Sequence, residues 1–385
     1  MIISTADLLQ DLVTQKENLA TNINGTGIEA NIQETLNTLV PKVPQVYNKG
    51  REDGYNEGSE VGYANGLADM VNMITNMENF SYLFYDKTYD FDTIIPYINT
   101  ANGINFSYMF AHSLLETIPL FDTSNGVNFA RMFYNTELQT VPLFDLSNGA
   151  DFSYMFWGCG NLKTVPSFNT KNGINFSYMF SNCMKLSSIP NLDTSNGTDF
   201  SHMFEYLGAN LSGAGAITLP TTMNTSNGVN FAHMFSRCYL AKYVPRMDTS
   251  NGTDFSYMYS NCQWITEVTG LNTSNGTKFS YMFEYCGRLE TIETLNLSKC
   301  TSASLSLFNA WNNKIKNITF DGTIPCSLTF YSNVLTYESL IGMINALVDY
   351  SGTTTTRTLK IGTTNLNKLT DEEKAIATEK GWTLA

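Results

Sequence analysis

The chain repeats one short unit, and this repeat limits what it can fold into more than any other feature. Asn-Gly pairs recur with glycines at positions 103, 126, 149, 173, 197, 228, 252 and 276, at intervals of 23, 23, 24, 24, 31, 24 and 24 residues. The unit is Asp/Asn-Thr-Ser-Asn-Gly-x-Asn/Asp-Phe-Ser-x-Met-Phe, followed by Cys, Leu and Val/Ile-Pro. One unit cannot bury its apolar side alone, whereas stacked units can. The period therefore predicts coils that each contact mainly their neighbours.

Each unit carries two patterns of secondary structure. Phe176, Met179, Phe180 and Cys183 lie at i, i+3, i+4 and i+7, which predicts one face of a short helix. The predicted N-caps of these helices are Asn105, Asp151, Asn175, Asp199 and Asp254. The Leu-x-x-Val/Ile-Pro segment predicts a short strand, and Asn-Gly a turn with positive φ. The predicted fold class is α/β, a leucine-rich-repeat-like solenoid of about ten coils of 23–24 residues.

Five of the seven cysteines occupy one position of the repeat. The position seven residues after the first Phe is occupied by Cys159, Cys183, Cys238, Cys262 and Cys286. Other copies carry Ser, Thr, Leu or Trp there, which indicates a small buried packing position. We expect buried free thiols, with disulfides between neighbouring coils as an alternative. No histidine joins this series and no CxxC motif is present, so we predict no metal and no cofactor.

Three regions are predicted. Residues 1–76 form a helical attachment or oligomerisation region, 77–325 the solenoid, and 326–385 an α/β cap. The cap is predicted to contain a helix at 337–348, a strand at 356–361, a helix opened by a capping signal at 369–373 and a strand at 382–384. The N-terminal region has glycines four residues apart: Gly50, Gly54, Gly58, Gly62 and Gly66. They predict either a helical seam between copies of the chain or a flexible linker.

Composition and charge exclude several classes of function. The net charge of −13 argues against nucleic acid, whose phosphates it would repel. No apolar run is long enough to span a bilayer, so we expect no membrane insertion. The start, Met1 to Asp7, lacks the basic and apolar parts of a secretion signal, so we expect synthesis in a cytoplasm and exit by another route. No catalytic pair, nucleophile motif or phosphate loop stands out, and we expect no enzyme.

Two faces and one insertion are candidate binding surfaces. The third residue of Phe-Ser-x-Met-Phe points away from the core and forms a ladder: Tyr82, Tyr108, Arg131, Tyr154, Tyr178, His202, His233, Tyr257 and Tyr281. It is predicted to bind ligand, or else to pack between coils or against a sister chain. The outward positions of the strand face vary among copies: Leu120, Leu143, Ser167, Asn191, Thr222, Arg246, Gly270 and Thr294. The 31-residue unit adds a Gly/Ala-rich segment at 208–216, either a binding loop or a tolerated insertion.

The unit DTSNGTDFSYMYSNC, with Leu and Val-Pro beyond it, resembles the BspA-like leucine-rich repeat of bacterial and phage surface proteins. The resemblance covers about residues 77–320, because turn, helix and strand elements follow in the same order. The usual family unit has Asn-Val-Thr-Asn-Met where this chain has Asn-Gly-x-Asn-Phe. This resemblance implies a leucine-rich-repeat solenoid that acts in adhesion.

Both ends of the chain carry a second resemblance. The segment Thr38-Leu39-Val40-Pro41-Lys42-Val43 resembles the start of tail structural proteins of phages, and residues 366–377 with 381–384 resemble the close of phage repeat proteins. The resemblance implies a phage virion protein, in the tail or baseplate, that attaches to the host by binding a cell-surface glycan or protein as receptor. Other tail or baseplate proteins and a homo-trimer are the expected partners. A bacterial BspA-like cell-surface adhesin and, more distantly, a depolymerase are the alternatives.

Overall fold

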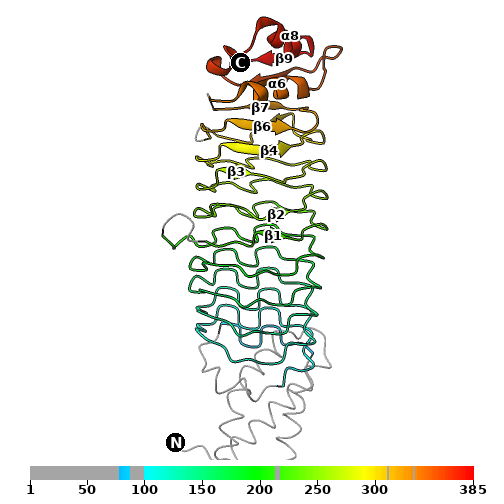
Figure 1. The fold of residues 1–385 in the computed structure, drawn as a ribbon. Coiled ribbons are helices and arrows are strands. Elements are labelled where there is room, and N and C mark those ends of the chain that lie inside the picture. Colours follow the sequence, from blue (N-terminus) through cyan, green and yellow to red (C-terminus); the bar gives the residue numbers. More distant parts are fainter. Residues whose placement is uncertain (1–77, 87–98, 213–216, 310–311, 333) are drawn as a thin grey trace, which may run out of the picture.

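The computed structural model describes residues 78–86, 99–212, 217–309, 312–332 and 334–385, which form a long stack of coils (Figure 1). Early coils lie at one end of the stack, and the helices of the last 50 residues lie at the other. The predicted N-terminal helices and the glycine seam from Gly50 to Gly66 lie outside the described residues. The expectation that repeat units stack on their neighbours therefore holds for the described array.

All strand pairing in the described part is parallel and joins one coil to the next. Strand β1 (Thr222–Met223) pairs with β2 (Arg246–Met247). A second sheet has the order β3 (Glu267–Val268), β4 (Thr291–Leu295) and β6 (Asn317–Phe320). The third has the order β5 (Ser304–Leu305), β7 (Ser327–Thr329), β8 (Arg357–Lys360) and β9 (Trp382–Leu384). The predicted strand is therefore present from β1 onward, whereas the earlier described coils show only a Ser188–Thr218 bridge in this segment.

The Phe-Ser-x-Met-Phe segment is not the helix that its spacing predicted. The N–H groups of Phe106, Tyr108 and Phe110 donate to carbonyls of the next coil, and those of Met109 and Ala111 donate to carbonyls three residues back. Tyr108 has a positive φ of 56°. The segment is thus a series of tight turns bonded to its neighbour coil. Its four-residue period places apolar side chains on one face, as a helix would, and this explains the error.

The residues predicted as N-caps do not cap helices but form hydrogen bonds within turns. The side-chain oxygen of Asn105 accepts from the N–H of Ser107 at 3.0 Å, and Asp151 accepts from Ser153 at 2.9 Å. The backbone of the same residues bridges coil to coil, from Asn79 through Asn105 and Asn128 to Lys278. These side chains therefore close Asx turns at the start of each turn series.

The Asp, Thr and Asn side chains of the Asp-Thr-Ser-Asn-Gly turn each make a particular hydrogen bond. The side chain of Asp122 caps the turn, because it accepts from the N–H of Ser124 at 2.9 Å. The hydroxyl of Thr123 donates to the next coil at Asp145 O, and the amide of Asn125 donates to the previous coil at Ala101 O, both at 2.7 Å. Equivalent hydrogen bonds of the Asp, Thr and Asn side chains recur in later coils. The motif therefore binds each coil to both neighbours.

The glycine of this turn does not have the predicted positive φ. A Cβ at Gly103 would lie 2.3 Å from Cζ of Phe106, and the other Asn-Gly glycines show the same approach, at 2.2–2.4 Å. Only glycine leaves the space that the Phe ring fills. The prediction was wrong in its cause, because the constraint is side-chain packing and not backbone conformation.

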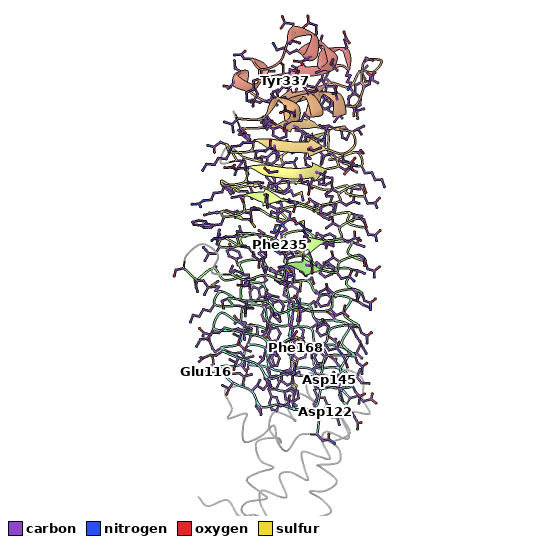
Figure 2. The ribbon with its side chains drawn as sticks, in the orientation of Figure 1. Glu116, Asp122, Asp145, Phe168, Phe235 and Tyr337 are labelled. Atoms are coloured by element: carbon purple, nitrogen blue, oxygen red, sulfur yellow. The ribbon has the colours of Figure 1, made fainter. Side chains whose placement is uncertain are left out.

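Buried side chains repeat along the stack and form the core. The first Phe of each unit stacks on its counterparts, as in Phe106–Phe129 with ring centroids 5.5 Å apart. The second Phe forms a parallel column, as in Phe156–Phe180 at 5.7 Å, and the Met between them is fully buried in each copy. Figure 2 shows Phe168 and Phe235 inside the stack, and Glu116, Asp122 and Asp145 at its margin.

The C-terminal elements follow the sequence prediction closely. Helix α6 (Tyr337–Ala346) is capped by Thr336, and helix α8 (Asp371–Glu379) begins with a full capping box between Thr370 and Glu373. The short helix α7 (Thr363–Leu366) was not predicted. Strands β8 and β9 continue the parallel ladder of β5 and β7, and Trp382 is buried against them. No helix in the described ranges has the length and apolarity needed to cross a membrane.

Candidate binding surfaces

The predicted ladder residues lie together in one continuous column. Tyr154 and Tyr178 stack with ring centroids 4.2 Å apart and planes 8° from parallel. The column continues through the rings of Tyr178 and His202 at 4.0 Å. Arg131 replaces a ring, with its Cζ 5.2 Å and 4.2 Å from the ring centroids of Tyr108 and Tyr154. The remaining contacts are Tyr82–Tyr108, His202–His233, His233–Tyr257 and Tyr257–Tyr281.

Stacking decides which parts of the ladder a ligand can reach. Every ladder residue has a positive φ, from 56° at Tyr108 and Tyr281 to 59° at Tyr178 and His233. This conformation is uncommon for residues other than glycine and aims the side chains along one face. Because neighbours cover the ring faces, ladder residues are mostly half-buried. A ligand would therefore contact ring edges and hydroxyl groups, and would not stack on the rings inside the column.

Beside the ladder runs a second aromatic column that the sequence analysis missed. It contains Tyr85, His112, Tyr134 and Trp157, with consecutive ring centroids 5.4, 5.1 and 4.6 Å apart. Tyr134 also lies 6.3 Å from Tyr154 of the ladder. Tyr85, Tyr134 and Trp157 share the position five residues after the first Phe of their units, and His112 lies one residue further along its own unit. The sequence analysis did not follow this position, because it varies more among the copies than the ladder position does. We call the ladder and this second column the aromatic face.

The strand face is exposed as predicted. Leu120 and Leu143 are 65% and 61% exposed, and Arg246 lies on the exposed side of β2. Among the predicted residues of this face, Thr294 is half-buried, because its hydroxyl donates to Leu271 O at 3.0 Å. The predicted loop at 208–216 is described only to residue 212.

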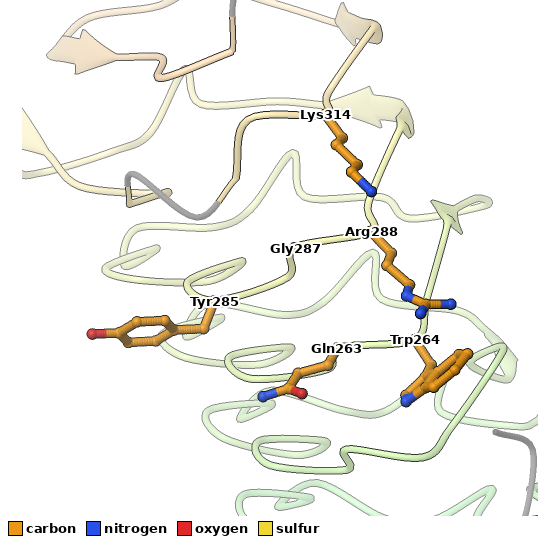
Figure 3. A pocket seen from close by; sticks show the side chains of 6 residues that line it. All are labelled: Gln263, Trp264, Tyr285, Gly287, Arg288 and Lys314. Atoms are coloured by element: carbon orange, nitrogen blue, oxygen red, sulfur yellow. The ribbon is translucent and has the colours of Figure 1, made fainter. Parts of the chain in front are cut away.

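A pocket of about 640 Å³ lies toward the C-terminal end of the array (Figure 3). Trp264, Arg288 and Lys314 line it one above another on successive coils, with Gln263, Tyr285 and Gly287 beside them. The guanidinium carbon of Arg288 lies 3.6 Å from the ring centroid of Trp264. An aromatic surface next to two cationic groups suits a sugar that carries a carboxylate. The sequence analysis missed this pocket, although Trp264 and Arg288 occupy one position of successive units.

Two ladder histidines and one carboxylate form a compact cluster. Nδ1 of His202 lies 2.7 Å from Oε2 of Glu205, and Nη1 of Arg237 lies 3.3 Å from Oε1 of the same carboxylate. His233 stacks on His202 at 4.2 Å, and its buried Nδ1 has no hydrogen-bond partner among the described residues. The ligand atoms of His202, Glu205 and His233 lie within 4.8 Å of one another. The sequence analysis missed Glu205, because its repeat position holds Ser, Ala, Tyr or Trp in most other copies.

Acid is expected to destabilise the fold through His233. Burial is the main cause that lowers the pKa of His233 from 6.5 to about 4; the charges of His202 and Arg237 contribute to this shift, and Glu205 and Asp254 oppose it. Above pH 6.5 the imidazole is neutral in both states. Between pH 6.5 and 4 the unfolded chain binds the proton and the folded chain does not, so stability falls as the pH falls. Melting temperatures across this range should therefore drop.

The matched variant for this prediction is His233→Tyr. Tyrosine holds the same ladder position in six copies, so the stack should remain. The decrease in melting temperature between pH 6.5 and 4 should become smaller than in the parent protein. An equal decrease in both proteins would show that His233 does not titrate as its burial implies.

All seven cysteines are free, as expected for the five in the repeat. Each repeat thiol donates to a carbonyl of the preceding coil, as Cys183 does to Phe156 O at 3.1 Å and Cys262 to Phe235 O at 3.0 Å. Burial raises the pKa of the Cys159 thiol to about 11. These thiols are structural donors in the core and have little nucleophilic character.

The comparison with known families matches the repeat that forms these surfaces. The family described as "Mycoplasma protein of unknown function, DUF285" matches residues 68–164, 137–214 and 210–319. The three matches together span residues 68–319, which is more than half of the chain and agrees with a BspA-like repeat protein. No curated protein and no solved structure matches the chain. By its repeats, this chain is a member of the DUF285 family.

Proposed function

We propose that the chain is a phage virion protein of the tail or baseplate that recognises the host cell surface through a leucine-rich-repeat-like solenoid. The aromatic face is the observation that carries the recognition part of this proposal. Its rings are fixed by contacts 4.0–5.1 Å apart along the ladder, from Tyr82–Tyr108 to Tyr257–Tyr281, except where Arg131 intervenes. Rigid aromatic groups give contact area at low entropic cost on binding.

The ligand class that suits this surface is a cell-surface glycan or protein. Tyrosine edges offer hydroxyl groups beside apolar carbon, a combination that fits both sugars and polypeptides. The pocket at Trp264 adds Arg288 and Lys314 for an acidic group. We further propose that the chain acts by binding and is not an enzyme, and that residues 1–76 join three copies and attach them to other virion proteins.

The virion part of the proposal rests on the sequences at both ends, Thr38 to Val43 and residues 366–384. A bacterial BspA-like surface adhesin is the second candidate, and the family description, which names a Mycoplasma protein, favours it. Mass spectrometry of purified phage particles separates the two. We expect peptides of this chain in the particles at a constant ratio to tail proteins. Detection on the surface of intact bacteria, and not in particles, would favour the adhesin.

Removing ring edges should weaken attachment to host cells. The triple variant Tyr154→Ser, Tyr178→Ser and Tyr257→Ser loses three half-buried rings with their edges and phenolic hydroxyl groups. Each phenolic hydroxyl offers a hydrogen bond to ligand worth about 0.5–1.5 kcal/mol. We expect binding to host cells to drop at least about tenfold, which corresponds to about 1.4 kcal/mol. The measurement is the cell-bound fraction of labelled protein over a range of concentrations.

A control on the strand face locates the site. The variant Asn191→Ala with Arg246→Ala changes exposed side chains outside the aromatic face and should leave binding unchanged. Melting curves of both variants report whether the stack is intact. Normal binding by the tyrosine variant together with lost binding by the control variant would move the site to the strand face.

A further inference from the structure

We propose that His202, Glu205 and His233 form a binding site for one divalent transition-metal ion of the Zn²⁺ class. The site lies on the ladder, where two histidines occupy the same position of successive coils and Glu205 lies beside them. Two imidazoles and one carboxylate, with water as a fourth ligand, are a common zinc ligand set. This inference does not depend on the proposed function.

The distances fit an ion with little movement. The ligand atoms of the three side chains already lie within 4.8 Å of one another. Two ligand atoms bound at about 2.0–2.1 Å to one tetrahedral Zn²⁺ are about 3.4 Å apart. Binding therefore needs an approach of at most about 1.5 Å, which rotation of the imidazole rings can supply.

Two features of the cluster distinguish it from ordinary ladder packing. Nδ1 of His233 is buried and without a partner among the described residues, which costs free energy in a site that only packs. Glu205 is 9% exposed, although most other copies carry an uncharged residue at its position. A buried carboxylate is retained more readily where a cation compensates it, and Arg237 contacts only one of its two oxygens. A metal ion would give Nδ1 of His233 a partner and would share the carboxylate of Glu205 with Arg237.

Arg237 limits the affinity and positions the carboxylate. Its Nη1 lies 3.3 Å from Oε1 of Glu205, while the other oxygen, Oε2, faces His202. Oε2 is therefore available to a metal ion once His202 turns its nitrogen from the carboxylate to the ion. The positive charge of Arg237 opposes a second cation nearby. Asn occupies the same repeat position at Asn182 and Asn261, so Arg237→Asn should preserve the coil and raise the affinity.

The test is titration of the full chain with Zn²⁺ by calorimetry, and with Co²⁺ by visible absorption, at pH 7.5. We expect one ion per chain. His233→Tyr, His202→Tyr and Glu205→Gln should each lower the affinity at least tenfold, and Arg237→Asn should raise it severalfold. The tyrosine variants keep the stack, because tyrosine is the usual ladder residue. Their melting curves without metal report whether folding is preserved.

Two control variants test whether His112 or Cys300 binds the metal ion instead. His112→Asn changes the remaining histidine, which pairs with Asn135 outside the cluster, and it should bind as the parent does. Cys300→Ser removes the half-buried thiol, whose pKa is lowered to about 7 by a hydrogen bond from Cys326. The proposal is overturned if the parent binds no Zn²⁺, if His233→Tyr binds it equally well, or if Cys300→Ser abolishes binding.

Discussion

Met179→Asp is expected to lower the free energy of unfolding by at least about 3 kcal/mol, because it places a carboxylate in a closed apolar layer. Met179 is fully buried between the Phe176 and Phe180 columns. No cation is within reach among the buried residues of this layer in the described coils. Since each coil is bonded to the next, the neighbours of this coil should open with it. Urea unfolding followed by circular dichroism measures the change.

Two variants of the same coil test this explanation. Met179→Leu keeps an apolar side chain of similar volume and should cost less than about 1.5 kcal/mol. Ile174→Asp places the same charge on a side chain that is 50% exposed and should change stability by less than about 1 kcal/mol. If Met179→Asp unfolded at the same urea concentration as Ile174→Asp, position 179 would not lie in the core.

The array and its core could be predicted from the sequence because the repeat fixes them. A period of 23–24 residues requires stacking, and recurring apolar positions such as those of Phe176, Met179 and Phe180 must share the buried side. The C-terminal elements could also be predicted, because Thr370 and Glu373 form a capping box that marks the start of α8. Here local chemistry and burial indicate the same structure.

The conformation of the buried segment could not be predicted from spacing alone. Successive tight turns and a helix both return to the same face after four residues, so Phe176 and Phe180 satisfy either structure. The deciding bonds are between coils, as from the N–H of Tyr178 to Ser201 O at 2.9 Å. A pattern within one unit carries no information about such bonds. The non-glycine residues with positive φ, such as Tyr178, lie in this segment.

The candidate sites also differ in how far the sequence could predict them. The ladder is one repeat position, so its residues could be named from the sequence, and the structure adds that they stack. The His202, Glu205 and His233 cluster combines two repeat positions across the long 31-residue interval, and the position of its carboxylate holds Glu again only at Glu284 among the copies from Phe80 to Phe279. The pocket at Trp264 depends on three coils and on side-chain length. Such sites need the stacked structure to be found.

Gly149→Ala is expected to lower the free energy of unfolding by about 1–3 kcal/mol or more, although it adds only one methyl group. A Cβ at this position would lie 2.4 Å from Cζ and 2.7 Å from Cε1 of the Phe152 ring. The ring cannot retreat easily, because it stacks on Phe129 at 5.8 Å and Phe176 at 5.6 Å in the neighbouring coils. Gly160→Ala is the matched control, since its nearest atom is 3.9 Å away in the same coil.

The cause of this loss can be isolated with Phe152→Leu, which removes the ring atoms that the new methyl group would meet. On its own this variant loses aromatic stacking and part of the buried side chain. If the clash is the cause, adding Gly149→Ala to Phe152→Leu should cost clearly less than adding it to the parent, with a coupling of at least about 1 kcal/mol in a double-mutant cycle. Equal costs in both backgrounds would instead mean that the backbone at Gly149 requires glycine, and that the repeated pairing of Asn-Gly with Phe three residues later has another origin.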